Sequence, residues 1–195
     1  MLILAKQLSE VPVMSLQTGA EIARTNGDII DPGTLDIIAY QLKGPRLQSN
    51  DTLLLTKDIR EVGEIGFIVD SSDELMQKDD LLKVSGIINL QFHLIGLEVI
   101  DDTKRHLGKV HDYGIDPMTF TVHQLHIKRP LLRSLQTSDL IVSRKQIIEI
   151  NNKAIIVSSA SLDERPAPAA IADNFVNPFR GTTSRPANNS DTTTD

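Results

Sequence analysis

The sequence predicts a mainly β protein made of two tandem small barrels, followed by a disordered C-terminal tail. Two long stretches of the chain repeat one another in their turn residues and apolar positions. Within them, apolar residues recur mostly with the period of two that is typical of half-buried strands. The tail is set apart by composition, since four of the nine prolines follow residue 162 and such a stretch buries too little apolar surface to fold.

Composition and charge narrow the class of protein. The 195 residues include 20 Lys and Arg against 26 Asp and Glu, a formal net charge of −6 at pH 7. This balance argues against a general polyanion binder but leaves room for a local basic patch. The chain has no cysteine, which excludes disulfides, thiolate metal sites and cysteine nucleophiles. No stretch approaches the roughly 20 apolar residues that span a bilayer, and the apolar start is too short for a secretory signal. We therefore expect a cytoplasmic protein without an integral membrane segment.

An internal repeat relates the first half of the chain to the second. At an offset of 85 residues, Ile30-Asp31-Pro32 aligns with Ile115-Asp116-Pro117. Further along the offset becomes 88, and Leu53–Ser71 aligns with Ile141–Ser159. Matching turn and apolar positions over two such blocks indicate a tandem duplication, with each copy folding as a similar barrel. The predicted domains are residues 8–87 and 90–160, and the predicted tail is residues 163–195.

In each copy an Asp-Pro turn leads into a strand, since proline fixes φ and pushes the preceding residue out of the helical region. The apolar positions of that strand change parity: in the first copy they run Leu35, Ile37, Ala39 and then Tyr40, Leu42. The second copy shifts in the same way. Because a change of parity moves side chains to the opposite face, a bulge or bend is predicted in this strand of both copies.

Each copy ends in a predicted hairpin. Its turn is Gly63-Glu64 in the first copy and Asn151-Asn152-Lys153 in the second. Thr56 and Ser143 are the predicted N-caps of a short helical turn just before each hairpin. At the start of the second copy, apolar and polar residues alternate over residues 88–94, which predicts a half-buried strand.

Taken together, these features resemble the PRC-barrel family over nearly all of residues 8–160. The resemblance is carried by the step Leu107-Gly108-Lys109-Val110, the Ile-Asp-Pro turn, the strand after it, and the cap and hairpin that close each copy. The first copy departs from the pattern at Ala23 and Thr25. Relatives in that family include the cytoplasmic part of the photosynthetic reaction centre H subunit and the C-terminal domain of a bacterial ribosome-maturation factor. The resemblance implies small barrels that dock on proteins or ribonucleoprotein, with no catalytic residue to transfer.

No cluster of polar residues has the spacing of a catalytic or metal site. Four histidines lie within 21 residues, namely His106, His111, His123 and His126. However, His123 and His126 point to opposite faces of a regular strand. The Asp and Glu clusters fall at turns, where carboxylates accept local backbone hydrogen bonds, and neither a G-x-S-x-G motif nor a phosphate-binding loop occurs. We therefore expect a protein that is not an enzyme and holds no metal or cofactor.

Basic residues gather in the second copy and are the candidate partner-binding positions. They are Lys128, Arg129, Arg133, Arg144 and Lys145. Clustered Lys and Arg contact phosphates or acidic surfaces, although they also form solvated rims. In the tail, Phe175 and Phe179 form an apolar island, which is compatible with a docking peptide or with a chance apolar stretch.

The leading functional hypothesis is a non-enzymatic scaffold or adaptor that docks on a protein partner. The family resemblance extends this to RNA or ribosome metabolism. The alternative is direct RNA binding, or binding to ribonucleoprotein, through the basic loops of the second copy. No aromatic residues are interleaved with these basic residues to stack on bases, so protein docking ranks first. An enzyme with a histidine–carboxylate site ranks last.

Overall fold

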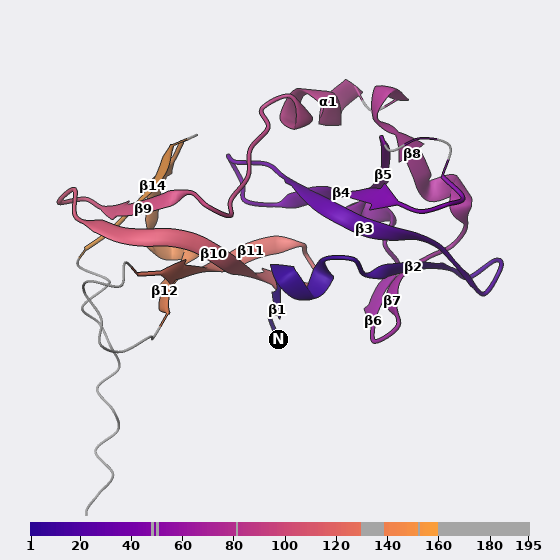
Figure 1. Cartoon of the computed structure of the whole chain (residues 1–195), viewed down its shortest axis with the longest axis horizontal. Coiled ribbons are helices and arrows are strands. Elements are labelled where there is room, and N and C mark those ends of the chain that lie inside the picture. Colours follow the sequence, from indigo (N-terminus) through magenta and orange to yellow (C-terminus); the bar gives the residue numbers. More distant parts are fainter. Residues whose placement is uncertain (48, 50, 81, 130–138, 152, 160–195) are drawn as a thin grey trace, which may run out of the picture. The chain divides into compact units, whose positions relative to one another are not determined.

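The computed structural model describes residues 1–159 apart from residues 48, 50, 81, 130–138 and 152. These residues form two curled sheets of seven strands each, with a single α-helix in the described part, which confirms the predicted mainly β class (Figure 1). The predicted tail at residues 163–195 lies outside the described residues. All described residues belong to one compact unit.

The first sheet is built entirely from the first repeat. Its strands are β2 (Pro12–Ser15), β3 (Ala20–Ile30), β4 (Ile37–Lys43), β5 (Thr52–Leu55), β6 (Glu61–Gly63), β7 (Gly66–Val69) and β8 (Leu75–Gln77). They lie in the order β6-β7-β2-β3-β4-β5-β8. Neighbouring strands are antiparallel except β2 and β7, which are parallel.

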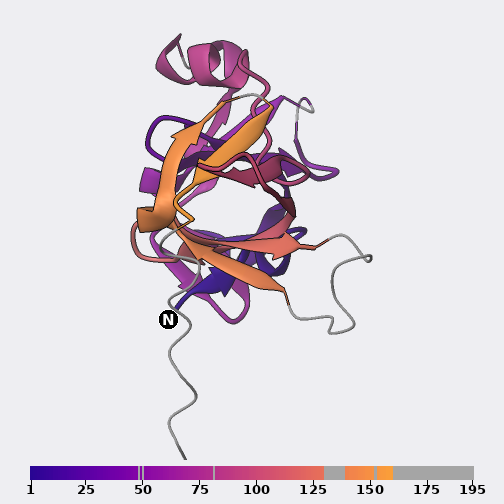
Figure 2. The same ribbon diagram turned by 90° about the vertical axis from the view of Figure 1, so that its left-hand side faces the viewer.

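The second sheet repeats this order. Its strands are β9 (Glu98–Asp101), β10 (His106–Asp116), β11 (Thr121–Lys128), β12 (Leu140–Ser143), β13 (Ile147–Ile150) and β14 (Ala154–Val157), in the order β12-β11-β10-β9-β14-β13. The parallel pair is β9 and β14, the counterpart of β2 and β7. A seventh strand, β1 (Ile3–Leu4), comes from the N-terminus and pairs with β10. Figure 2 looks toward this sheet and shows its strands curling around a common centre.

The predicted bulges are present at equivalent positions in both repeats. Pairing between β3 and β4 shifts register between Ile29 and Ile30, which leaves Ile38 as the extra residue. Pairing between β10 and β11 shifts between Gly114 and Ile115, where His123 is the extra residue. Ile38 and His123 are equivalent at the offset of 85. The change of apolar parity is therefore a reliable signal of the bend, because the bulge moves the following side chains to the other face.

The predicted hairpins also form, as β6–β7 and β13–β14. The turn of the first one is Glu64-Ile65, not Gly63-Glu64 as predicted, because Gly63 pairs with Gly66 in the ladder. The short turn before each is a 3-10 helix, η2 (Thr56–Asp58) or η6 (Arg144–Gln146). Ser143 is an N-cap as predicted, since its hydroxyl accepts from the Lys145 N–H at 3.4 Å. The cap assignment of Thr56 is wrong. Thr56 is the first residue of its turn, and its hydroxyl instead donates to the Ile37 carbonyl oxygen at 2.9 Å.

The strand predicted over residues 88–94 is also wrong. Helix α1 (Leu82–Ile88) ends where that strand was expected to begin, and turns and irregular backbone follow it. Val84, Ile87 and Ile88 have the spacing of a helix face, and they pack on a small apolar cluster of the first sheet. Phe92 and Leu94 are buried from irregular backbone, whereas Leu90, the apolar residue before them in the alternation, is half exposed.

Candidate docking site at the junction of the two repeats

The two Asp-Pro turns meet and join the repeats. Leu35 and Phe120 close these turns with positive φ angles of 56° and 54°. Ile37 donates its N–H to the Phe120 carbonyl oxygen at 2.8 Å, and Val122 donates to the Leu35 carbonyl oxygen at 2.9 Å. Since Leu35 matches Phe120 and Ile37 matches Val122 at the offset of 85, the two bonds are reciprocal. This is the geometry of a twofold dimer interface, here within one chain.

Side-chain contacts also join equivalent positions of the two repeats. The Thr121 hydroxyl donates to the Asp36 carboxylate at 2.7 Å, and Asp36 and Thr121 are equivalent positions. The Phe120 ring lies against two rings of the first sheet, with centroids 6.2 Å from Tyr40 and 6.0 Å from Phe67. A single hydrophobic cluster contains buried residues of both sheets. The two repeats therefore share one core.

One end of the junction is tied by Arg144. This residue begins η6, and its guanidinium donates to the Thr34 carbonyl oxygen in the Asp-Pro turn of the first repeat. The sequence placed Arg144 among the partner-binding cations. In the structure its guanidinium is already engaged with the chain's own backbone, so its position favours a role in holding the repeats together.

The other end is open. The position equivalent to Arg144, at the offset of 88, is Thr56, whose short side chain turns back to the Ile37 carbonyl. A groove of about 630 Å³ lies here between residues 56–62 and the turn at residues 117–120. We call it the junction groove. Its walls include Ile59, Val62 and Met118, and Met118 is 87% exposed.

Only some of the polar groups that line the junction groove have a hydrogen-bond or ion-pair partner. Arg60 is paired with Asp70, with the guanidinium nitrogen 2.6 Å from the carboxylate oxygen. Lys57 and Glu61 are exposed on the walls. Thr119, the counterpart of Thr34, also lines the groove, and no described side chain donates to its carbonyl oxygen as Arg144 does at the other end. Among its apolar side chains the groove therefore has one carboxylate, Glu61, one cation outside an ion pair, Lys57, and the turn residue Thr119.

The remaining predicted residues do not gather at this junction. Lys128 and Arg129 are exposed at the end of β11, and Lys145 is exposed in η6. No described carboxylate lies within ion-pair distance of these three cations. Arg133, Phe175 and Phe179 lie outside the described residues. Sequence reasoning missed the junction groove, although aligning Arg144 with Thr56 carried the signal.

The histidines do not assemble a metal site in the described part of the chain. His111 and His126 lie near one another, with ring centroids 6.2 Å apart, and His111 is 3.0 Å from the Asp139 carboxylate. No group of three or more His, Asp or Glu residues among the described ones has the geometry to hold a metal ion. His123 occupies the bulge of β11 instead.

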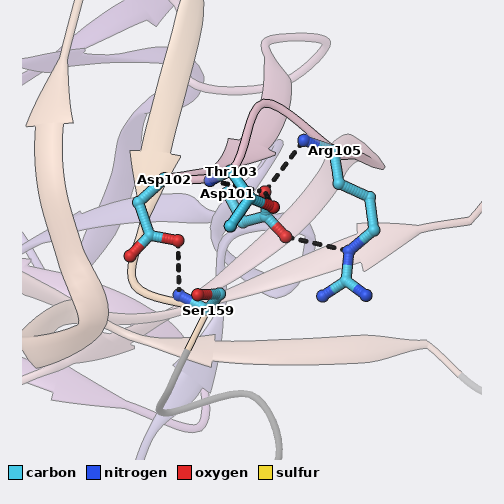
Figure 3. Close-up of polar contacts among 5 residues, drawn as sticks. All are labelled: Asp101, Asp102, Thr103, Arg105 and Ser159. Atoms are coloured by element: carbon cyan, nitrogen blue, oxygen red, sulfur yellow. Dashed lines mark hydrogen bonds and ion pairs between the residues drawn. The ribbon is translucent and has the colours of Figure 1, made fainter.

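The carboxylates of the β9–β10 turn stabilise that turn (Figure 3). The Asp101 carboxylate accepts from the Thr103 N–H at 3.0 Å, the Thr103 hydroxyl at 2.7 Å, and the Arg105 N–H and Nε–H at 2.8 Å each. The Thr103 hydroxyl bond, followed by the bonds from Arg105, lowers the pKa of Asp101 despite the opposing effect of its burial. Asp102 accepts from the Ser159 N–H at 3.2 Å. The Asp101 contacts agree with the local role that the sequence predicts for the turn carboxylates, whereas Asp102 instead joins the turn to a residue 57 positions further along the chain.

No protein-family model matches the chain, and no curated protein sequence matches it. The resemblance to PRC-barrel proteins therefore rests on the repeated turn, strand and hairpin pattern. None of the helices in the described ranges is long and apolar enough to cross a membrane.

Proposed function

We propose that this protein is a non-enzymatic adaptor that docks on a protein partner by binding an extended, arginine-bearing segment in the junction groove. The observation that carries the proposal is the difference between the two ends of the junction. Arg144 donates to the Thr34 carbonyl at one end, whereas Thr56 leaves about 630 Å³ open at the other. The resemblance to PRC-barrel proteins favours a docking role of this kind in RNA or ribosome metabolism.

An arginine from the partner would supply what the first repeat lacks. Its guanidinium has donors for the Thr119 carbonyl and for the exposed carboxylate of Glu61, both on the groove wall. Its methylene stem can lie against Met118 and Val62. Lys57 on the same wall disfavours a second cation next to the first. These features favour a segment with one arginine flanked by apolar residues.

Selection of peptides from a random library on the full chain tests the proposal. We expect the selected peptides to share one arginine at a fixed position, because its planar guanidinium donates to the carbonyl and the carboxylate in one fixed geometry, which favours it over a lysine ammonium. Thr56→Arg, which places in the first repeat the residue found at the equivalent position of the second, should weaken binding of such a peptide at least tenfold, about 1.4 kcal/mol.

Two controls accompany Thr56→Arg. Lys128→Ala, outside the groove, should change peptide affinity less than twofold, and the melting temperature of Thr56→Arg should confirm that it is folded. Selected peptides that carry no shared arginine would contradict the proposal, as would unchanged affinity in folded Thr56→Arg.

Direct RNA binding is the second candidate, favoured by the three exposed cations Lys128, Arg129 and Lys145, which have no described carboxylate partner. RNA retention should then fall with rising salt, and Lys128→Glu combined with Arg129→Glu should reduce the salt dependence by about two phosphate contacts. If single-stranded RNA is not retained at low salt, this candidate fails.

A further inference from the structure

A second, smaller hollow of about 190 Å³ lies beneath the N-terminal 3-10 turn η1 (Ala5–Leu8). We call it the tyrosine pocket, after Tyr40 and Tyr113, and its wall also includes Asp28, Leu8, Ile95 and the cation Lys6. Its volume corresponds to about six liquid waters. Both repeats and the N-terminal turn contribute to it, and it is separate from the junction groove.

The pocket contains a buried hydroxyl without a partner. Tyr40 is only 2% exposed, and its hydroxyl has no hydrogen-bond partner among the described residues. Tyr40 sits opposite Asp28 in the β3–β4 register. Buried hydroxyl groups are nearly always hydrogen-bonded. The Tyr40 oxygen therefore has an unused hydrogen-bonding capacity, but almost none of its surface is accessible, so neighbouring side chains must shift before a molecule in the pocket can reach it.

The pocket also contains the Asp28 carboxylate, whose pKa is lowered by the charge of only one basic residue, His93. The Tyr113 hydroxyl donates to one oxygen of Asp28, but no described Lys or Arg forms an ion pair with that carboxylate. The nearby Lys6 ammonium lies 4.0 Å from the carboxylate of Asp112. Burial raises the pKa of Asp28, and the Tyr113 hydrogen bond only partly opposes that effect. A cation beside Asp28 would offset the cost of burying its charge.

We propose that the tyrosine pocket binds a small organic cation, namely a primary ammonium group on a short alkyl chain. The ammonium would donate to the free oxygen of Asp28 and to the Tyr40 oxygen. Leu8 and Ile95 provide the apolar surface that an alkyl chain would cover.

The repeats make this pocket asymmetric. Asp28 is equivalent to Tyr113, and Tyr40 is equivalent to Leu125, at the offset of 85. The first repeat therefore supplies the carboxylate and the available hydroxyl, while the second supplies a tyrosine and the N-terminal turn covers them. A cation with a short apolar chain fits this combination, whereas an anion would face the Asp28 carboxylate.

Calorimetric titration of the full chain at neutral pH, with butylammonium, butanol and butyrate as probes, tests the proposal. We expect saturable binding of butylammonium and none of the neutral or anionic analogue. Asp28→Asn should weaken butylammonium binding at least tenfold. Tyr40→Phe, which removes only a hydroxyl without a partner, should remain folded and weaken binding about threefold. Asp79→Asn, an exposed carboxylate outside the pocket, should change nothing.

The proposal is overturned if butylammonium shows no saturable binding, or if butanol or butyrate binds as tightly. It is also overturned if Tyr40→Phe, folded by its melting temperature, binds butylammonium as the unmodified chain does. That variant gives a result even if Asp28→Asn fails to fold. Since the junction groove is not involved, peptide binding there should be the same with and without butylammonium.

Discussion

Replacing Phe120 with alanine should lower the free energy of unfolding by about 3–5 kcal/mol, the range for truncating a buried aromatic side chain. Phe120 is 6% exposed, and its ring contacts Tyr40 and Phe67 of the other repeat. Alanine at the same φ of 54° carries a similar backbone strain, so the loss measures packing. Urea unfolding followed by circular dichroism gives the value, and we expect a single transition.

Met118→Ala is the matched control for Phe120→Ala. Met118 belongs to the same turn but is 87% exposed, so its truncation should change stability by less than about 0.5 kcal/mol. Equal losses in the two variants would contradict the shared core. A second unfolding transition in Phe120→Ala would also contradict it, because one repeat would then unfold without the other.

Gly108→Ala should destabilise the protein by about 3 kcal/mol or more. The φ of Gly108 is +144°, and a Cβ there would lie 2.2 Å from the Lys128 carbonyl oxygen. Backbone in this region costs a non-glycine residue about 1–3 kcal/mol, and relieving the clash with rigid β11 backbone adds to that. The melting temperature of the variant should fall accordingly.

Gly19→Ala is the control that separates the stability cost of the steric clash from the cost of the positive φ angle. Gly19 has a φ of +65°, and a Cβ added there would meet no atom within 4 Å, so alanine should cost only about 1–2 kcal/mol. Similar losses at both glycines would show that β11 moves aside. The first repeat has Ala23 at the position of Gly108, and Ala23 is not among the residues with positive φ. This accounts for the departure that the sequence comparison finds there.

Local signals predicted much of the fold. The parity change predicted a bulge or bend in each of these strands, because a bulge acts on the side chains of its own strand, and the structure places the bulges at Ile38 and His123. The two hairpins were equally local signals, although the first turn lies one residue later than the predicted Gly63-Glu64. Helix α1 was missed because its seven residues are short and the alternation just after it has the period of a strand. Thr56 was assigned as a cap because its long-range acceptor, Ile37, is not visible in sequence.

The candidate site was harder to predict because it depends on contacts between the repeats. Nothing local indicates that the turns at Leu35 and Phe120 pair with one another, or that the two-residue strand β1 joins the second sheet. The clustering of Lys and Arg in the second copy predicted that Arg144 binds a partner. In the structure its guanidinium instead donates to the Thr34 carbonyl oxygen of the first repeat. The alignment of Arg144 with Thr56 was available from the sequence. That this difference leaves one end of the junction open could be recognised only once the twofold arrangement of the repeats was known.

Native-state hydrogen exchange at the Ile37 and Val122 amides tests most directly whether the repeats form one unit through their junction. Each amide donates to a carbonyl of the other repeat, so neither is protected unless the junction is closed. We predict that both exchange only through global unfolding, with the same free energy of opening as the central amides of β3 and β10. Exchange of either amide at a much lower free energy, with β3 or β10 still protected, would show that the repeats separate and would contradict the account.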